Sequence, residues 1–132
     1  MSRSIPNRAL VVVADGHGAI LLRNEGSAGD VSLREERRLS PKNLRDEGPS
    51  GSRPPEQTPR QTDEATFAKQ LAEALYKMKQ SGDFKDLVLV ADPQTLGQFR
   101  DAMHKELEAS IVLTLAKELT NHSIAEIADA LR

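Results

Sequence analysis

The chain has 132 residues, of which 38% are hydrophobic and 29% are charged, and its formal net charge is −2. These values are typical of one globular domain with a core of ordinary size. The small net charge provides no general attraction to nucleic acid or anionic lipid, so neither DNA nor a membrane is expected as a partner. The lack of cysteine excludes a disulfide framework, a thiolate zinc site and a cysteine nucleophile. The sequence shows no export signal, and we expect a cytoplasmic protein.

The N-terminal part predicts three strands joined by tight turns. Residues 9–14 and 19–23 are mostly apolar, and Asp15-Gly16-His17-Gly18 between them is a strong hairpin signal. Glycine is expected here to supply the positive φ that such a turn needs. Residues 31–38 predict a third strand, and the charges at its end suit an exposed sheet edge.

Residues 39–61 have a different composition from the rest of the chain. The stretch contains five prolines and two glycines and almost no apolar side chains. Such a composition cannot bury enough apolar surface to become ordered, and it predicts a long mobile loop within a single domain, 1–132.

The next part of the chain alternates between helical and strand patterns. A helix is predicted from Thr62 or Asp63 to about Gln80, because five apolar residues share one face at helical spacing. The members of this face are Phe67, Leu71, Ala74, Leu75 and Met78. The uninterrupted apolar run 87–91 predicts a strand that is buried on both faces.

The C-terminal part predicts two more helices and one more strand. The first helix starts at Asp92 or Thr95 and runs to about Leu107, with Leu96, Phe99, Met103 and Leu107 on its apolar face. Residues 111–115 predict a strand, although a helical continuation from Glu106 is an alternative. Ser123 and Glu126 form a capping box that opens a last helix through Leu131.

The predicted order is therefore β-β-β-α-β-α-β-α. Hairpins followed by right-handed crossovers put the first strand at the centre, beside the fourth, and give the sheet order 3-2-1-4-5. We predict a three-layer α/β domain with a five-stranded mixed sheet. Ribonuclease H-like domains and the middle domain of archaeal and eukaryotic peptide-chain release factors have this topology.

Five short motifs occur in order along nearly the whole chain. They are Val12-Val13-Ala14-Asp15-Gly16, Phe67-Ala68-X-X-Leu71-Ala72, Phe84-X-X-Leu87-Val88-Leu89-Val90-Ala91, Leu96-Gly97-X-X-Arg100 and Leu119-Thr120. Together they resemble the bacterial family named "protein required for attachment to host cells", which is itself similar to the release-factor middle domain.

The resemblance implies a non-enzymatic interaction or regulatory module that contributes indirectly to attachment to host cells. Release-factor middle domains carry a Gly-Gly-Gln tip that promotes peptidyl-tRNA hydrolysis, and no Gly-Gly-Gln occurs in this sequence. The hydrolytic role therefore does not carry over. A ribosome- or tRNA-associated factor or hydrolase of release-factor ancestry is the alternative, and a divalent-metal nuclease is a second one.

Asp15 and Asp92 are the candidate metal ligands. Each follows a predicted central strand, and parallel neighbours end at the same sheet edge, where ligands of open α/β sheets bind. Two carboxylates there could hold Mg²⁺ through oxygen ligands, which is the one cofactor the sequence suggests. Asp before Gly is also an ordinary turn residue, and Asp before Pro is an ordinary helix cap, so both interpretations stay open.

Candidate binding residues lie in the first turn and in the long loop. Asp15 and His17 lie in the turn, and His17 could act as a general base, although a solvated turn histidine is the plainer interpretation. Arg45, Arg53 and Arg60 could follow phosphates of an RNA or ribosomal partner. The acidic residues between them favour a solvated surface of mixed charge instead. The alternative partner is an unknown protein.

Overall fold

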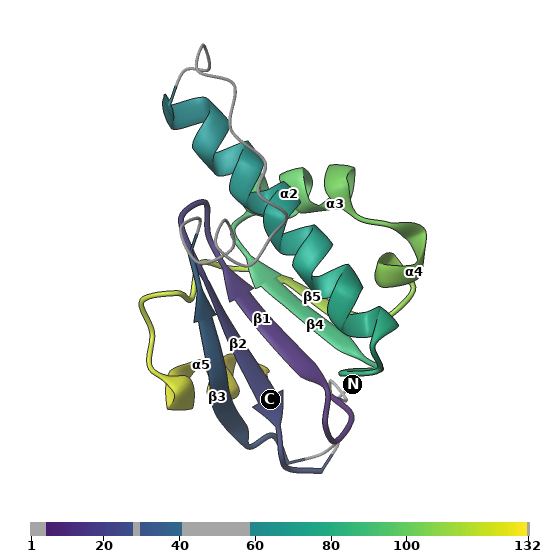
Figure 1. The fold of residues 1–132 in the computed structure, drawn as a ribbon. Helices are drawn as coiled ribbons and strands as arrows, with labels where there is room; N and C mark the ends of the chain where they lie inside the picture. Colours follow the sequence, from purple (N-terminus) through teal and green to yellow (C-terminus); the bar gives the residue numbers. More distant parts are fainter. Residues whose placement is uncertain (1–4, 28–29, 41–58, 132) are drawn as a thin grey trace.

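The structure is a five-stranded sheet with helices on both faces (Figure 1). The computed structural model describes residues 5–27, 30–40 and 59–131. The strands are β1 (Leu10–Ala14), β2 (Ala19–Asn24), β3 (Leu33–Leu39), β4 (Leu87–Ala91) and β5 (Ile111–Ala116). The described helices are α2 (Pro59–Gln80), α3 (Pro93–Ala102), α4 (Lys105–Glu108) and α5 (Ile124–Leu131).

The predicted sheet order is confirmed. The strands lie in the order β3-β2-β1-β4-β5, with β1 antiparallel to β2 and parallel to β4. β4 and β5 are also parallel, so the sheet is mixed. β1 is central because the hairpin places β2 on one side of it and the crossover through α2 places β4 on the other.

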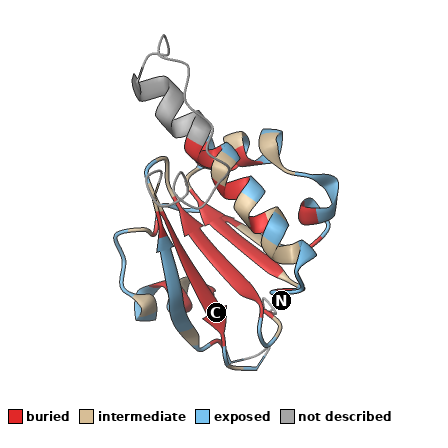
Figure 2. Cartoon of the chain, viewed as in Figure 1, coloured by how far each residue is buried: buried red, intermediate tan, exposed pale blue. Residues whose placement is uncertain are grey.

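Both faces of the sheet are covered, which explains the uninterrupted apolar strands (Figure 2). Successive side chains of a strand point to opposite faces. In β1, Leu10, Val12 and Ala14 pack in one core with α2, α3 and α4, whereas Val11 and Val13 pack in a second core with α5. These two cores make the domain three-layered, as predicted.

α2 begins earlier than expected. It starts at Pro59 and not at Thr62 or Asp63, and proline suits the first turn of a helix because its missing N–H would be unpaired there. The predicted loop 39–61 is shortened accordingly, and its part 41–58 lies outside the described residues. The apolar face of α2 is confirmed, with Phe67, Leu71 and Leu75 fully buried. No helix in the described part of the chain combines the length and apolarity needed to cross a membrane.

The first hairpin forms as predicted, but its turn is built differently. Among the described glycines only Gly82 has a positive φ, of 82°, so Gly16 and Gly18 are not there for left-handed geometry. The carboxylate of Asp15 closes the turn, because its Oδ1 accepts hydrogen bonds from the backbone N–H groups of His17 and Gly18 at 2.7 and 2.8 Å.

The helix predicted from Asp92 to Leu107 is interrupted. α3 ends at Ala102, Met103 and His104 are extended, and α4 follows as a separate turn from Lys105. The His104 ring stacks on Tyr76 of α2 with centroids 3.8 Å apart, and Leu107 beyond the break is fully buried. β5 is a strand over Ile111–Ala116, so the helical alternative for this segment is wrong.

Candidate functional site at the carboxyl edge of the sheet

The two aspartates meet at one edge of the sheet. β1 and β4 pair in parallel with Ala14 opposite Ala91, so Asp15 and Asp92 follow the strands at the same level. Both side chains line a shallow polar pocket of about 220 Å³. The prediction that these residues lie at a common edge is confirmed.

Asp15 links the hairpin to a distant segment. While Oδ1 holds the turn, Oδ2 accepts a hydrogen bond of 2.8 Å from Oγ1 of Thr120, which lies 105 residues further along the chain. Both residues belong to motifs that were noted in the sequence, but nothing in the spacing indicated that they touch. Asp15 therefore positions the chain between β5 and α5 as well as the hairpin turn.

Asp92 is the N-cap of α3. Its Oδ2 accepts from the backbone N of Thr95 at 3.1 Å, and its Oδ1 accepts from Oγ1 of Thr95 at 2.7 Å. Pro93 occupies the first helical position, where proline is favoured. The interpretation of Asp92 as a cap residue is confirmed, and the alternative start at Thr95 is wrong.

The pocket between these two aspartates is acidic and rich in hydrogen-bonding groups. Three segments form it: the β1–β2 turn, the start of α3, and the segment after β5. Its lining residues are Asp15, Gly16, His17, Asp92, Gln94, Thr95, Gln98 and Glu118. Three carboxyl groups with one histidine favour cations and hydrogen-bond donors and repel phosphate. Gln94, Gln98 and Glu118 were not predicted, because only the fold brings them to this edge.

The geometry leaves the Mg²⁺ site as a prediction. The described residues contain no group of three or more His, Asp or Glu side chains that could hold a metal ion. Both oxygens of Asp15 and of Asp92 already accept hydrogen bonds from the protein. These hydrogen bonds give both aspartates a structural role that needs no metal ion.

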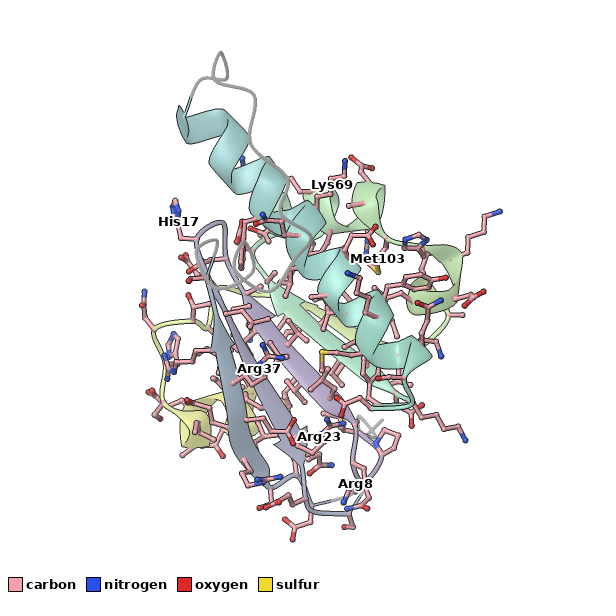
Figure 3. All side chains as sticks on the ribbon, in the orientation of Figure 1. Arg8, His17, Arg23, Arg37, Lys69 and Met103 are labelled. Carbon is pink, nitrogen blue, oxygen red and sulfur yellow. The ribbon has the colours of Figure 1, made fainter. Side chains whose placement is uncertain are left out.

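His17 lies at the tip of the hairpin and points away from the sheet (Figure 3). Its side chain is exposed, and its backbone N donates to Asp15. A general base would need a reacting group held within hydrogen-bond reach. The exposed position agrees with the interpretation of His17 as a turn residue.

The three basic candidates belong to the long loop and the start of α2, and β3 carries further arginines. Arg45 and Arg53 lie outside the described residues, and Arg60 lies in the first turn of α2, with its side chain also outside them. On β3 the arginines are interleaved with acids: Arg38 donates to both oxygens of Glu35 at 3.0 Å. This hydrogen bond and the opposite charge raise the pKa of Arg38 and lower that of Glu35. β3 therefore presents a surface of mixed charge.

A buried arginine at the other end of the strands, away from the pocket, was not predicted from the sequence. The side chain of Arg23, which is labelled in Figure 3, is only 6% exposed. It forms ion pairs of 3.1 Å with both Glu36 and Asp83. Burial lowers the pKa of Arg23, but the hydrogen bonds and charges of these two acids outweigh burial, and the pKa is raised. The one indication of this buried arginine in the sequence was a single charged residue near the end of an otherwise apolar strand.

The fold and its polar edge define a three-layer α/β domain of mixed sheet topology. The chain belongs to bacterial archaeo-eukaryotic release factor family 12, whose sequence model matches residues 8–131. The predicted relationship to release factors is confirmed by this match. Among curated proteins, none matches this chain.

A solved structure described as "Archaeal protein" has a similar fold. It aligns with a TM-score of 0.51 and 13% sequence identity, over 92% of this chain and 32% of that chain. This chain therefore spans about a third of the archaeal protein. At this identity the likeness shows the shared α/β fold alone, and the narrower ribonuclease H-like assignment stays a prediction.

Proposed function

We propose that this chain is a release-factor-like module that associates with the ribosome or with tRNA and does not hydrolyse peptidyl-tRNA. The observation that carries the proposal is membership of a bacterial release factor family over residues 8–131. The missing Gly-Gly-Gln removes the motif on which release-factor hydrolysis depends. The family relationship thus favours binding, and the sequence argues against that catalysis.

The sequence between β3 and α2 carries the arginines that we propose contact RNA. Leu39, at the end of β3, pairs with Ala19 beside the first hairpin, so β3 ends at the edge of the sheet that carries the pocket. The N-terminal end of α2 lies at the same end of the molecule (Figure 1). Arg45, Arg53 and Arg60 belong to this part of the sequence, and arginine binds phosphate through its planar fork of donors.

The acidic pocket is a poor phosphate site and does not take part in this proposal. Asp15, Asp92 and Glu118 would repel a nucleic acid backbone at close range. RNA contact would therefore have to come from Arg45, Arg53 and Arg60 and not from the pocket. The arginines and the pocket residues can therefore be tested separately by substitution.

A contribution to host attachment would be indirect in this proposal. Most residues of the five attachment-family motifs are buried, including Phe67, Leu71 and the strand 87–91, so these motifs support the fold and do not form a contact surface. We therefore propose that any effect on attachment follows from a role in translation. Buried motifs of this kind are expected in a family whose members share a fold and differ in their surface residues.

Co-sedimentation with ribosomes at low and high salt tests the proposal. We expect the protein in the ribosomal pellet at about 50 mM salt and its release at about 200 mM, because phosphate contacts weaken steeply with salt. Replacing Arg45, Arg53 and Arg60 by Gln should weaken binding and lower the salt slope by about one for each arginine that contacts a phosphate.

The matched control removes three arginines from β3 instead. Arg34→Gln, Arg37→Gln and Arg38→Gln change the net charge equally but lie among acidic neighbours, so ribosome binding should stay near that of the wild type. Absence of the wild-type protein from the pellet at low salt would overturn the proposed function. Equal losses in both triple variants would reject the arginine-bearing segment as the contact.

A further inference from the structure

The pocket at the carboxyl edge of the sheet contains polar side chains that the fold does not use. Gln94 and Gln98 line the pocket from α3, and Glu118 lines it from the segment after β5. Within the described part of the chain, none of these three side chains takes part in a hydrogen bond or an ion pair. Asp15 and Asp92 differ from them, because their oxygens hold the turn and the helix cap. The three unused side chains are therefore available to a group from outside the chain.

The pocket favours a small cation that binds through hydrogen bonds. Its described lining contains three carboxyl groups and no lysine or arginine, and Lys117, which precedes Glu118, does not line it. Its volume of about 220 Å³ is below the roughly 300–1,000 Å³ of pockets for drug-sized ligands, so a single side chain suits it better than a nucleotide. The available acceptors are two amide oxygens and one carboxylate. A guanidinium group matches them well, because it offers five N–H donors in one plane.

A glycine on the exposed side of α3 lies beside the pocket. Gly97 follows Gln94 by three positions, so the two residues are neighbours on the helix surface. Gly97 is exposed, a Cβ atom there would meet nothing within 4 Å, and its φ is not positive. The fold therefore does not require glycine at this position, and glycine is a poor helix former. The missing side chain does allow the backbone of another chain to approach α3 closely.

We propose that this edge is a docking site for an extended basic segment of a partner protein. One arginine side chain of the segment enters the pocket and donates to Gln94, Gln98 and Glu118, and the backbone of the segment lies against Gly97. Charge complementarity selects this occupant, because the carboxyl groups of the pocket attract a guanidinium and repel an acidic segment or a phosphate. The docking site uses none of the arginines that we propose contact RNA, so it goes beyond that function and does not depend on it.

An NMR titration of the isotope-labelled chain with a short peptide tests the docking site. The probe is the blocked pentapeptide Gly-Gly-Arg-Gly-Gly, and the control peptide has citrulline, an uncharged isostere, in place of arginine. We expect the arginine peptide to shift the amide resonances of Gly16 and Gly97 with a Kd of about 1 mM or tighter, and the citrulline peptide to bind about tenfold more weakly. No shift of these resonances up to about 10 mM arginine peptide overturns the proposal, as does equal binding of the two peptides.

Replacing one carboxylate tests the recognition of charge in the pocket. Glu118→Gln keeps the size of the side chain, breaks no hydrogen bond of the described fold and should weaken binding of the arginine peptide about fivefold. Glu108→Gln makes the same change of charge at an exposed position on α4 that does not line the pocket, and this variant should bind like the wild type. Equal affinities of the two variants would overturn the role of the pocket.

A substitution outside the pocket tests the backbone contact. Gly97→Gln fills the open space beside the pocket and should weaken binding of the pentapeptide about tenfold. The variant should fold at least as well as the wild type, because glutamine is the better helix former, and circular dichroism checks this. Binding of methylguanidinium, which has no peptide backbone, should stay unchanged. Unchanged binding of the pentapeptide would overturn the backbone contact, and so would an equal loss of methylguanidinium binding.

Discussion

At the scale of single residues, Gly26 occupies a position that no larger residue fits. A Cβ atom there would overlap the carbonyl oxygen of Asp30 and lie 3.0 Å from the backbone N of Ser32. The neighbouring backbone is held in place by Asn24, whose Oδ1 accepts from the N–H groups of both Gly26 and Ser32 at 3.0 Å. The turn cannot relax without breaking these hydrogen bonds.

Gly26→Ala should therefore lower the free energy of unfolding by roughly 1–3 kcal/mol, as overpacking typically does. Urea denaturation at neutral pH measures the change. Gly97→Ala is the matched control, because a Cβ atom at Gly97 meets nothing within 4 Å and alanine is the better helix former. That variant should be more stable than the wild type by about 0.5–1 kcal/mol. An unchanged Gly26→Ala protein would show that the turn adapts.

The sequence predicted local roles of residues better than distant ones. Of the two interpretations left open for Asp15 and Asp92, the turn and cap roles are confirmed, because the groups concerned lie within three positions, and the metal site stays a prediction. The contact of Asp15 with Thr120 could not be predicted, since it depends on where the last loop passes the hairpin. The same limit applies to Glu118 in the pocket, which joins the site only through the fold.

At the scale of elements, the capping box of α5 shows how a local pattern fixes a helix start. The backbone N of Ser123 donates to Oε1 of Glu126 at 2.9 Å, and the backbone N of Glu126 donates to Oγ of Ser123 at 3.2 Å. This reciprocal pair was predicted from the sequence and is confirmed. The break between α3 and α4 was missed, because it involves contacts of His104 with Tyr76 and Glu73 on α2.

The capping box makes the stability of α5 depend on pH. The hydrogen bond from the backbone of Ser123, followed by that with its side chain, lowers the pKa of Glu126 below the ordinary 4.5. A lowered folded-state pKa contributes stability above pH 4.5 that is lost as the pH falls through the folded value. Glu126→Gln should therefore be less stable than the wild type at pH 7, and the difference should shrink as the pH falls below 4.5.

Ser123→Ala removes one of the two hydrogen bonds of the capping box and leaves the other, so it tests them separately. It removes the hydroxyl acceptor and should lower the free energy of unfolding by about 1 kcal/mol at pH 7. The pH-dependent effect of Glu126→Gln should persist when it is combined with Ser123→Ala, because the main donor to Glu126 is the backbone N of residue 123. Thermal unfolding from pH 3 to pH 7 measures both effects, and parallel curves for wild type and Glu126→Gln would contradict the expected pH dependence.

At the scale of the whole molecule, the sheet order followed from the sequence because few topologies satisfy hairpins and right-handed crossovers together. The two fully apolar central strands indicated a sheet covered on both faces, and the two cores confirm it. Element ends were less predictable: β3 runs over Leu33–Leu39 and not 31–38, because its exposed side chains give no periodic signal.

Arg23 joins four separate parts of the chain, and its role was not predictable from any one of them. Its guanidinium donates to Glu36 on β3, to the side chain and carbonyl oxygen of Asp83 before β4, and to the carbonyl oxygen of Arg8 before β1. The bulge between β2 and β3 leaves Glu36 without a directly opposite residue on β2, and Glu36 instead binds Arg23. These hydrogen bonds of Arg23 lie at the end of the sheet opposite the pocket.

Arg23→Lys should destabilise the whole domain by roughly 2–3 kcal/mol, although it keeps the charge. A lysine ammonium cannot reproduce a planar fork that reaches three residues at once, so the buried charge at position 23 would lose some of its hydrogen-bond partners. Arg38→Lys is the control, because its pair with Glu35 is exposed and should be dispensable. Urea unfolding with and without 1 M NaCl measures both, and the Arg23 effect should survive the salt because buried charges are screened little. Equal stability of Arg23→Lys and the wild type would show that charge alone, and not the geometry of the guanidinium, joins these four segments.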